Sequence, residues 1–371
     1  MTAELLISMA VAVAFLAGMG LVLSALLILA ERKILNYGTC KISINDGKKE
    51  LSVKGGAFLL FNLAENDIFI PSACGGRGSC AYCKVNVLEG GGPIGPVEAP
   101  YLSPEEQQDH TRLSCQVKVR RDVKIVIPEE LFSVRRYTGI LESKRPLTYD
   151  TLELRIRLPE PDTIDFTAGQ YVQLESEEYK GRDAVMRAYS MSSPPSDKNH
   201  VELIIRRVPD GIMTTWIFDY LEEGQNITFS GPYGQFCLAE TDAPMVFIAG
   251  GSGMAPIWSM LRDMKENGIE RPTTFFFGAL TQKDLFFVDE LNQLQEELPW
   301  FTFVPALSDE PEDSDWNGER GLITDVVAKY FPDVSKHEGY LCGSPGMINA
   351  CVAVLTDADM PETCIFYDKF A

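Results

Sequence analysis

The stretch Cys74-Gly75-Gly76-Arg77-Gly78-Ser79-Cys80-Ala81-Tyr82-Cys83 holds three cysteines within ten residues, in the spacing C-x5-C-x2-C. A fourth cysteine, Cys115, follows Cys83 after a gap of thirty-one residues. The three glycines of the stretch allow positive φ angles and a close approach of the backbone to a bound group. We therefore expect a loop that curls around a small inorganic centre held by thiolates.

This spacing is close to the plant-type pattern of a [2Fe-2S] cluster, in which the first gap is one residue shorter. A zinc site with four cysteine ligands is the alternative, but such sites usually have two separated C-x2-C pairs, and this chain has one. A disulfide framework fits poorly, because nine cysteines in 371 residues is an odd number in a long chain. The pattern favours a [2Fe-2S] cluster with the ligands Cys74, Cys80, Cys83 and Cys115.

The composition indicates a large, folded, acidic protein. The chain of 371 residues is long enough for two or three domains, and its 45% of apolar residues can fill substantial cores. The net charge of −20 argues against a nucleic-acid partner, because phosphate binding requires clustered lysine and arginine. We interpret the acidity as favouring solubility.

The N-terminal region contains one long uncharged stretch. Residues 5–30 form a run of 26 residues without a charged side chain, which exceeds the roughly 20 needed for a helix to span a bilayer. A cleaved signal peptide is the alternative, but it would need a positive segment before a shorter apolar core. Glu4 precedes the run, whereas Arg32 and Lys33 follow it. We therefore expect a transmembrane anchor within residues 1–35, with the N-terminus outside and the later residues in the cytoplasm.

Residues 36–130 predict a small α+β domain around the cysteine loop. Alternating residues at 41–45 and 48–53 flank Asn45-Asp46-Gly47, which is typical of a hairpin turn. Further strands are expected at 84–88, 116–119 and 123–127, and a short helix is expected at 58–64. A small sheet with one helix and a cluster loop at its edge is the β-grasp, ferredoxin-like arrangement.

Residues 131–240 are rich in short strands that are separated by turn residues. Strands are expected at 151–158, 170–175, 201–208 and 226–230. Short strands at such regular intervals predict a closed antiparallel barrel of the Greek-key kind.

Within this barrel, Arg187-Ala188-Tyr189-Ser190 has the residue types that bind a flavin. An aromatic ring can lie against the isoalloxazine, a hydroxyl can hydrogen bond near its reactive nitrogen, and an arginine can pair with the pyrophosphate. Gly211 then precedes an expected helix at 213–221, whose free N–H groups would bind phosphate. Ordinary barrel packing is the alternative for Tyr189, but the combination of features favours FAD.

Residues 241–371 change to the pattern of an α/β domain with a parallel sheet. The apolar run 245–249 is typical of a buried parallel strand, and it leads into Gly250-Gly251-Ser252-Gly253 and a helix expected at 256–266. Strand, glycine turn and helix form the phosphate-binding corner of a nucleotide fold. Further strands are expected at 273–278, 301–307 and 339–342, and further helices at 284–297 and 322–331.

Two features of this domain concern the choice of nucleotide. The acidic stretch Ser308-Asp309-Glu310 follows a predicted strand, and such a loop repels a 2′-phosphate, which favours NADH over NADPH. A solvated loop without effect on specificity is the alternative. Cys342 ends the last long predicted strand, at the edge where ligands bind in such folds. It either contacts the nicotinamide or is one more buried cysteine.

Together, these motifs resemble the ferredoxin-NADP reductase-type flavoproteins, and most closely the family formed by the F subunits of the Na⁺-translocating NADH:quinone oxidoreductases. The resemblance covers essentially the whole chain, and the longer first cysteine gap is typical of that family. It implies hydride transfer from NADH to FAD, then passage of single electrons to the [2Fe-2S] cluster and on to membrane partners and quinone. It also implies a multisubunit Na⁺-translocating complex of the bacterial inner membrane, in which this chain is single-pass with its soluble domains on the cytoplasmic side.

The same resemblance implies roles for individual residues. Contacts with FAD are implied for Arg187, Tyr189, Ser190, Gly211, Met213 and Thr214, and contacts with NADH for Gly251, Gly253 and Cys342. Phe370 would cover the flavin until the nicotinamide displaces it. Ser190, Cys342 and Phe370 are therefore the expected catalytic residues.

The chain departs from the family pattern in two places. The segment between Tyr171 and Arg187 is much shorter than in the family, and the end Asp368-Lys369-Phe370-Ala371 differs from the usual Asp-Phe-Gly-Gly. A membrane-anchored reductase that feeds an oxygenase is the alternative function, since it differs only in the partner. A redox-sensing protein with bound flavin and negligible NADH oxidation is a further alternative.

Overall fold

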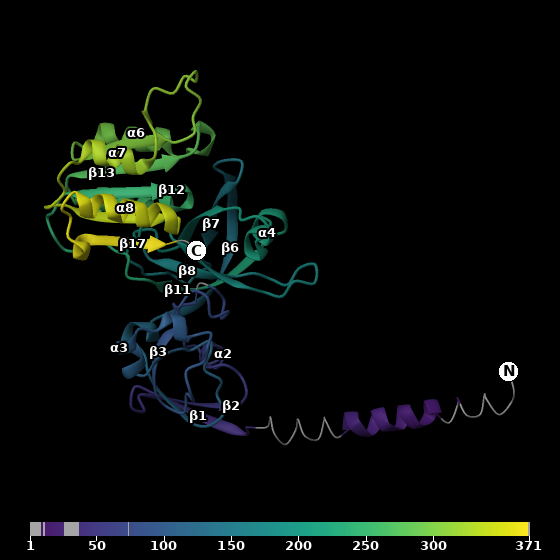
Figure 1. Ribbon diagram of the computed structural model, residues 1–371. Helices are drawn as coiled ribbons and strands as arrows, with labels where there is room; N and C mark the ends of the chain where they lie inside the picture. The colour runs from purple at the N-terminus through teal and green to yellow at the C-terminus, as the bar shows by residue number, and fades with distance from the viewer. Residues whose placement is uncertain (1–8, 10–11, 26–36, 73, 370–371) are drawn as a thin grey trace. The chain divides into compact units, whose positions relative to one another are not determined.

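A computed structural model describes residues 9, 12–25, 37–72 and 74–369 of the chain. They fall into two compact units (Figure 1). The first unit is Met1–Ile70 with Gly76–Phe132, and the second is Pro71–Gly75 with Ser133–Ala371.

The predicted membrane span at 5–30 lies partly outside the described residues. Within that span, residues 12–25 are helical. In the described part of the chain, no helix is both long enough and apolar enough to cross a membrane.

The first unit contains a mixed five-stranded sheet in the order β2-β1-β5-β3-β4. Its strands are β1 (Thr39–Ile44), β2 (Lys49–Lys54), β3 (Lys84–Glu89), β4 (Thr111–Leu113) and β5 (Val123–Val126), and its helices include α2 (Leu59–Ala64) and α3 (Pro104–Gln108). The predicted hairpin is confirmed, because β1 and β2 pair antiparallel across Asn45, Asp46 and Gly47, which all have positive φ. The β1–β5 pair is parallel and the remaining pairs are antiparallel.

The strand predicted at 116–119 is wrong. Val117 and Val119 are fully buried, but their backbone groups bind the segment that leads into α2 rather than a strand of the sheet. The Val117 carbonyl accepts from the Leu59 amide at 2.8 Å, and the Val119 amide donates to the Ala57 carbonyl at 3.0 Å. The alternation at 116–119 therefore reflects a buried connection that positions the start of α2.

One buried ion pair fixes the connection between β3 and β4. Arg112 and Glu98 have side chains that are only 7% and 1% exposed. The Arg112 guanidinium also donates to the carbonyls of Gly91, Gly92 and Pro93, and Glu98 accepts from the Leu113 amide at 3.2 Å. A buried charge is tolerated when it is paired and fully hydrogen bonded, so this pair holds the loop at 91–98 against β4.

The second unit begins with a six-stranded antiparallel barrel, as predicted. Its strands are β6 (Arg135–Pro146), β7 (Thr151–Arg157), β8 (Tyr171–Glu175), β9 (Met186–Ser190), β10 (His200–Arg206) and β11 (Asn226–Tyr233), and its helix is α4 (Ile212–Asp219). The order is β10-β7-β6-β11-β8-β9. A bridge between Met191 and Leu203 joins the two edge strands and closes the barrel.

A parallel six-stranded sheet follows in the order β15-β14-β13-β12-β16-β17. Its strands are β12 (Met245–Gly250), β13 (Thr273–Ala279), β14 (Phe301–Leu307), β15 (Glu319–Arg320), β16 (Glu338–Gly343) and β17 (Ile365–Lys369), and its helices are α5 (Met254–Asn267), α6 (Val288–Glu297), α7 (Ile323–Tyr330) and α8 (Pro345–Asp357). Helices α5 and α6 pack on one face, and α7 and α8 on the other. The strands are therefore buried on both sides, as continuous apolar runs predict.

Strand β10 links the barrel to this sheet within the second unit. Its odd-numbered residues Val201, Leu203 and Ile205 belong to the barrel core, whereas Ile204 belongs to the core around α5. Glu202, on the same face as Ile204, accepts from Arg262 of α5 at 2.6 Å and from Arg155 of β7. One strand thus carries contacts to both halves of the unit.

Arg112→Ala should destabilise the first unit by about 3–5 kcal/mol, because it leaves the buried Glu98 carboxylate without a cation. Calorimetry of the full chain would measure the loss in the transition of that unit. All four tryptophans lie in the second unit, so the thermal transition in tryptophan fluorescence should not move.

The pH dependence of the thermal transition of the first unit provides a second test of the ion pair. Burial alone would raise the pKa of Glu98, but its hydrogen bonds to Arg112 and Gly95 hold that pKa below its usual value. The carboxylate therefore adds stability above its unfolded pKa of about 4.3, and this stability is lost as pH falls through the lower folded pKa. Glu98→Gln should abolish this acid-side loss. An unchanged acid limb would show that the pair does not stabilise the unit.

Candidate cofactor and nucleotide sites

The cysteine loop combines left-handed backbone with buried thiols. Gly76 and Gly78 have φ angles of 85° and 79°, and Ala81 has a φ angle of 60°, so the backbone curls as the sequence predicts. Cys83 and Cys115 are each 1% exposed. The hydrogen bond between these two thiols, together with burial, raises the pKa of Cys83. The structure therefore brings two of the four predicted ligands together.

The structure gives less information on the other two predicted cluster ligands. Cys80 is half-buried, and Cys74 belongs to the segment Pro71–Gly75 of the second unit. Among the described residues, no three metal-ligating side chains converge on one point. The Gln116 amide donates to the Cys115 sulfur at 3.4 Å, and such N–H groups stabilise the sulfur ligands of iron–sulfur clusters. The thiol pair, the amide donor and the left-handed loop all fit a [2Fe-2S] cluster.

The predicted flavin residues share strand β9, which pairs with β8. Tyr189 lies opposite Val172, and Ser190 opposite Tyr171. Tyr189 packs against the barrel core, and burial raises the pKa of its phenol, so the ring stays neutral at physiological pH. Ser190 is only 4% exposed.

A buried amide on β8 faces the same side as Ser190. Gln173 lies opposite Ala188 and is 2% exposed, and its Nε2 has no hydrogen-bond partner among the described residues. An unsatisfied buried donor costs about 1–3 kcal/mol, and a ring with carbonyl and nitrogen acceptors would remove that cost. This orphan donor fits a bound flavin, and sequence analysis missed it because a glutamine on a strand carries no motif.

The side chains at the start of α4 make contacts within the protein. Met213 is 2% exposed and packs in the barrel core. The Thr214 hydroxyl binds the Val208 carbonyl at 3.2 Å, and a Cβ on Gly211 would lie 2.6 Å from that hydroxyl. Only the backbone N–H groups of this turn are left to meet a ligand, and no side chain caps them. A helix start of this kind suits phosphate.

The glycine turn of the parallel sheet is confirmed as part of a strand–turn–helix unit. A 3₁₀ turn at Gly251–Gly253, called the glycine corner below, joins β12 to α5. Helix α5 begins at Met254, two residues before the predicted start at Pro256. A Cβ on Gly253 would lie 2.2 Å from the Cys342 carbonyl oxygen. The turn thus lies directly against the backbone of β16. Any side chain at residue 253 would push the turn away from β16 and alter the phosphate site at the helix start.

An arginine that sequence analysis missed lies at this corner. Arg206 ends β10, and its Nη1 is 3.7 Å from the position of a Cβ on Gly251. A planar guanidinium beside a glycine turn suits bidentate contact with a pyrophosphate. The unusual burial of β10 on both faces was the available signal, since it places the last residue of that strand against the neighbouring sheet.

Cys342 lies at the predicted edge but is fully buried. Burial raises the pKa of its thiol well above the ordinary value, and the negative charge of Asp368 adds to the effect. Phe370, which the sequence predicts to cover the flavin, lies outside the described residues. On β17, next to β16, Phe366 stacks on Tyr340 with ring centroids 5.0 Å apart.

The acidic loop after β14 is held in place by its own contacts. Glu310 accepts from the Gln282 amide group at 2.8 Å, and Arg320 donates to the carbonyls of Glu310 and Pro311. Arg320 also donates to the Ser314 hydroxyl and to the Trp316 carbonyl, so these contacts hold the loop together.

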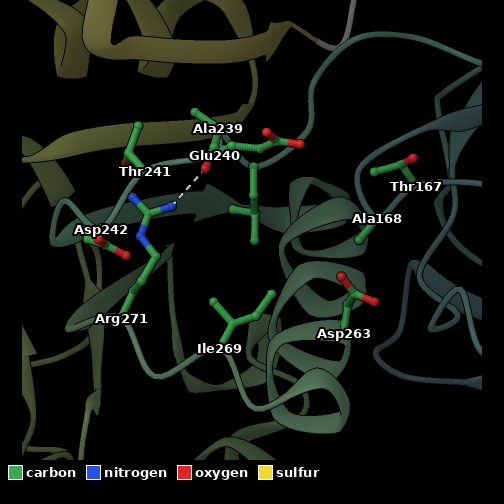
Figure 2. A pocket seen from close by; sticks show the side chains of 10 residues that line it. Thr167, Ala168, Ala239, Glu240, Thr241, Asp242, Asp263, Ile269 and Arg271 are labelled. Carbon is green, nitrogen blue, oxygen red and sulfur yellow. Dashed lines mark hydrogen bonds between the residues drawn. The ribbon is translucent and has the colours of Figure 1, made fainter.

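Figure 2 shows a cavity of about 370 Å³ at a different edge of the sheet. It is lined by Thr167, Ala168, Leu238, Ala239, Glu240, Thr241, Asp242, Asp263, Ile269 and Arg271. Arg271 is bound to the buried Glu338 at 2.7 Å. The lining residues from 238 to 242 precede β12, and Ile269 and Arg271 precede β13, so the cavity lies at the amino ends of these strands, away from the glycine corner.

The three modules define a flavin- and iron–sulfur-dependent NADH oxidoreductase. Residues 42–120 match the 2Fe-2S iron-sulfur cluster binding domain, residues 138–237 the oxidoreductase FAD-binding domain, and residues 247–353 the oxidoreductase NAD-binding domain. The F subunit of the Na(+)-translocating NADH-quinone reductase of Neisseria meningitidis is 37% identical, with 94% of this chain and 96% of that protein covered. The corresponding F subunit of Pseudomonas aeruginosa is 36% identical, with 94% and 95% covered. The chain belongs to the family of the F subunits of Na⁺-translocating NADH-quinone reductases.

Solved structures are similar to this chain over most of its length. The Amycolatopsis cytochrome P450 reductase GcoB superposes with a TM-score of 0.73 at 29% identity, with 90% of this chain and 99% of that chain covered. The ferredoxin reductase in carbazole 1,9a-dioxygenase superposes with a TM-score of 0.69 at 26% identity and the same coverage. The alignment with the Neisseria protein runs over 393 positions, more than the 371 residues of this chain. The relative therefore has residues that this chain lacks.

Gly253→Ala should abolish reduction of the flavin by NADH while the protein keeps its flavin, because the added Cβ would displace the glycine corner from β16. Stopped-flow absorbance of the flavin after mixing with NADH measures the rate. Gly346→Ala is the matched control, since a Cβ at Gly346, in the first turn of α8, has no atom within 4 Å. Normal reduction in the Gly253 variant would show that the corner does not hold the nucleotide.

Proposed function

We propose that this chain is the electron-entry subunit of a membrane-bound, Na⁺-translocating NADH:quinone oxidoreductase. When bound, FAD accepts a hydride from NADH, and the [2Fe-2S] cluster passes single electrons on toward quinone. The observation that carries the proposal is the relationship to the F subunits over 94% of the chain, which includes all three redox modules in order.

The proposed modules are an anchor at 1–35, a [2Fe-2S] domain at 36–130, an FAD barrel at 131–240 and an NADH domain at 241–371. The uncharged run at 5–30 supports the anchor. The anchor would place the chain in the bacterial inner membrane with its redox domains in the cytoplasm. The partners are the other subunits of the complex, which deliver electrons to quinone and move Na⁺.

The cluster would be held by Cys74, Cys80, Cys83 and Cys115, with the Gln116 amide donating to the Cys115 sulfur. In the barrel, Arg187 would bind the FAD pyrophosphate, Tyr189 would lie against the ring system and Ser190 would donate near its reactive nitrogen. Gly211, Met213 and Thr214 would meet FAD through backbone N–H groups alone, because their side-chain positions are packed internally.

The nucleotide would lie along the carboxyl ends of the parallel strands. Gly251 and Gly253 would meet its pyrophosphate, together with Arg206. Cys342 and Phe370 would flank the reacting nicotinamide. The acidic loop at 308–310 supports NADH rather than NADPH.

A reductase that serves an oxygenase is the second candidate. The similarity to the cytochrome P450 reductase GcoB and to the carbazole dioxygenase reductase favours it. Both candidates share the NADH, FAD and cluster chemistry and differ in the acceptor. The F subunits of the quinone reductases are more similar in sequence, at 37% and 36% identity against 29% and 26% for the two reductases, so we rank that function first.

Cys80→Ala should abolish the absorbance and the paramagnetic signal of the cluster, while NADH still bleaches the flavin. The reason is that the thiolate is a cluster ligand, whereas the nucleotide and flavin residues lie in the second unit. Cys364→Ala is the control, since Cys364 is another half-buried cysteine far from the loop in sequence. Failure of flavin reduction in the Cys80 variant would contradict the modular assignment.

Purification of the chain from its native membranes in mild detergent tests the function itself. Co-purifying multi-span subunits and Na⁺-dependent quinone reduction with NADH, at least roughly tenfold faster than with NADPH, are the expected results. Co-purification of an oxygenase component, or no quinone reduction, would replace the first candidate with the second. Equal rates with the two nucleotides would remove the role of the acidic loop.

A further inference from the structure

Asp150 lies in the turn between β6 and β7, and its carboxylate accepts three side-chain hydrogen bonds. Its Oδ1 accepts from the hydroxyl of Thr148 at 3.0 Å and from the hydroxyl of Thr151 at 2.9 Å. Its Oδ2 accepts from Nε of Arg206 at 2.7 Å. Two short, local hydroxyl bonds thus orient the carboxylate toward an arginine that is 56 residues away in sequence.

This bond constrains how Arg206 can be presented. It occupies Nε, the inner nitrogen of the guanidinium, and no other hydrogen bond to that guanidinium is found in the part of the chain that the structure describes. The terminal nitrogens Nη1 and Nη2 are therefore available, and Nη1 lies beside Gly251. Without the carboxylate, the long arginine side chain would sample several rotamers at an entropic cost to any ligand contact.

The turn that carries Asp150 is also attached to the parallel sheet. The Tyr149 hydroxyl donates to Asp284 at 2.9 Å, and Asp284 accepts from the amide and the hydroxyl of Thr281. Thr281 follows β13, whose carboxyl end neighbours that of β12. The same turn therefore contacts the barrel strand that bears Arg206 and the sheet edge that bears the glycine corner.

We propose that Asp150 is a positioning residue that holds Arg206 in the orientation required to bind the pyrophosphate of NADH. The inference rests on the proposed NADH site. Asp150 touches neither the nucleotide nor the flavin, and its effect is exerted through Arg206. Replacement of Asp150 should therefore change the affinity for the dinucleotide and leave the limiting rate of hydride transfer unaltered.

The test uses the full-length, flavin-loaded chain and four variants: Asp150→Ala, Arg206→Ala, the double variant, and Asp219→Ala. Asp219→Ala is the control, because it breaks the exposed ion pair between Asp219 and Arg207, whose charged atoms are 2.6 Å apart. Arg207 directly follows Arg206 in the chain and points to the opposite side. Stopped-flow flavin reduction gives the Kd of NADH and the limiting rate for each protein. Inhibition by ADP-ribose, which has the pyrophosphate but no nicotinamide, measures binding without hydride transfer.

Arg206→Ala and Asp150→Ala should each raise the Kd of NADH and of ADP-ribose by roughly tenfold, the effect of one charge-assisted hydrogen bond. The double variant should bind no more weakly than Arg206→Ala alone, because Asp150 has no function once the guanidinium is gone. The limiting rate should be unchanged in Asp150→Ala, and Asp219→Ala should match the parent protein.

Three outcomes would overturn the inference. Additive losses in the double variant would show an independent role, and unchanged or tighter NADH binding in Asp150→Ala would show that Asp150 only neutralises the arginine. Asp150→Asn, which keeps the shape of the turn, repeats the measurement if the alanine variant fails to fold. An unchanged Kd in Arg206→Ala would instead reject the proposed phosphate contact, and with it the basis of the inference.

Discussion

The buried carboxylate of Glu202 joins the barrel to the parallel sheet. It is 8% exposed and bound by Arg155 from β7 and by Arg262 from α5. A buried charge of this kind is stable only while its partners stay in place, so any displacement of α5 from the barrel would cost several kcal/mol. Because α5 starts at the glycine corner, this contact fixes the corner relative to the flavin strand.

Strand β10 extends the same constraint to the nucleotide site. Successive residues of a strand point to opposite faces, so Glu202, Ile204 and Arg206 share the face toward the sheet, as the assignment of Ile204 to that core shows. The position of Arg206 at the corner therefore follows from the register that Glu202 sets four residues earlier. A guanidinium at residue 207 would point the other way, and Arg207 does pair with Asp219 of α4 instead.

The sequence predicted the modules well because each has a local signature. The cysteine loop, the Arg-x-Tyr-Ser strand and the glycine corner are short motifs whose chemistry is set by neighbouring residues. The site residues that it missed, Gln173 and Arg206, carry no motif of their own, and their positions depend on how the strands that bear them pair with their neighbours. The wrong strand at 116–119 has the same origin, since an alternating pattern reports burial but does not specify the partner.

The short connection between β8 and β9 holds helix α4 in place. Lys180 and Gly181, with φ angles of 47° and 72°, close a tight hairpin of the kind favoured by two left-handed residues. The Tyr179 hydroxyl on this hairpin donates to the Ile212 carbonyl at 2.7 Å, and its ring packs on Tyr220 at 4.9 Å. A hairpin this short therefore secures both ends of α4.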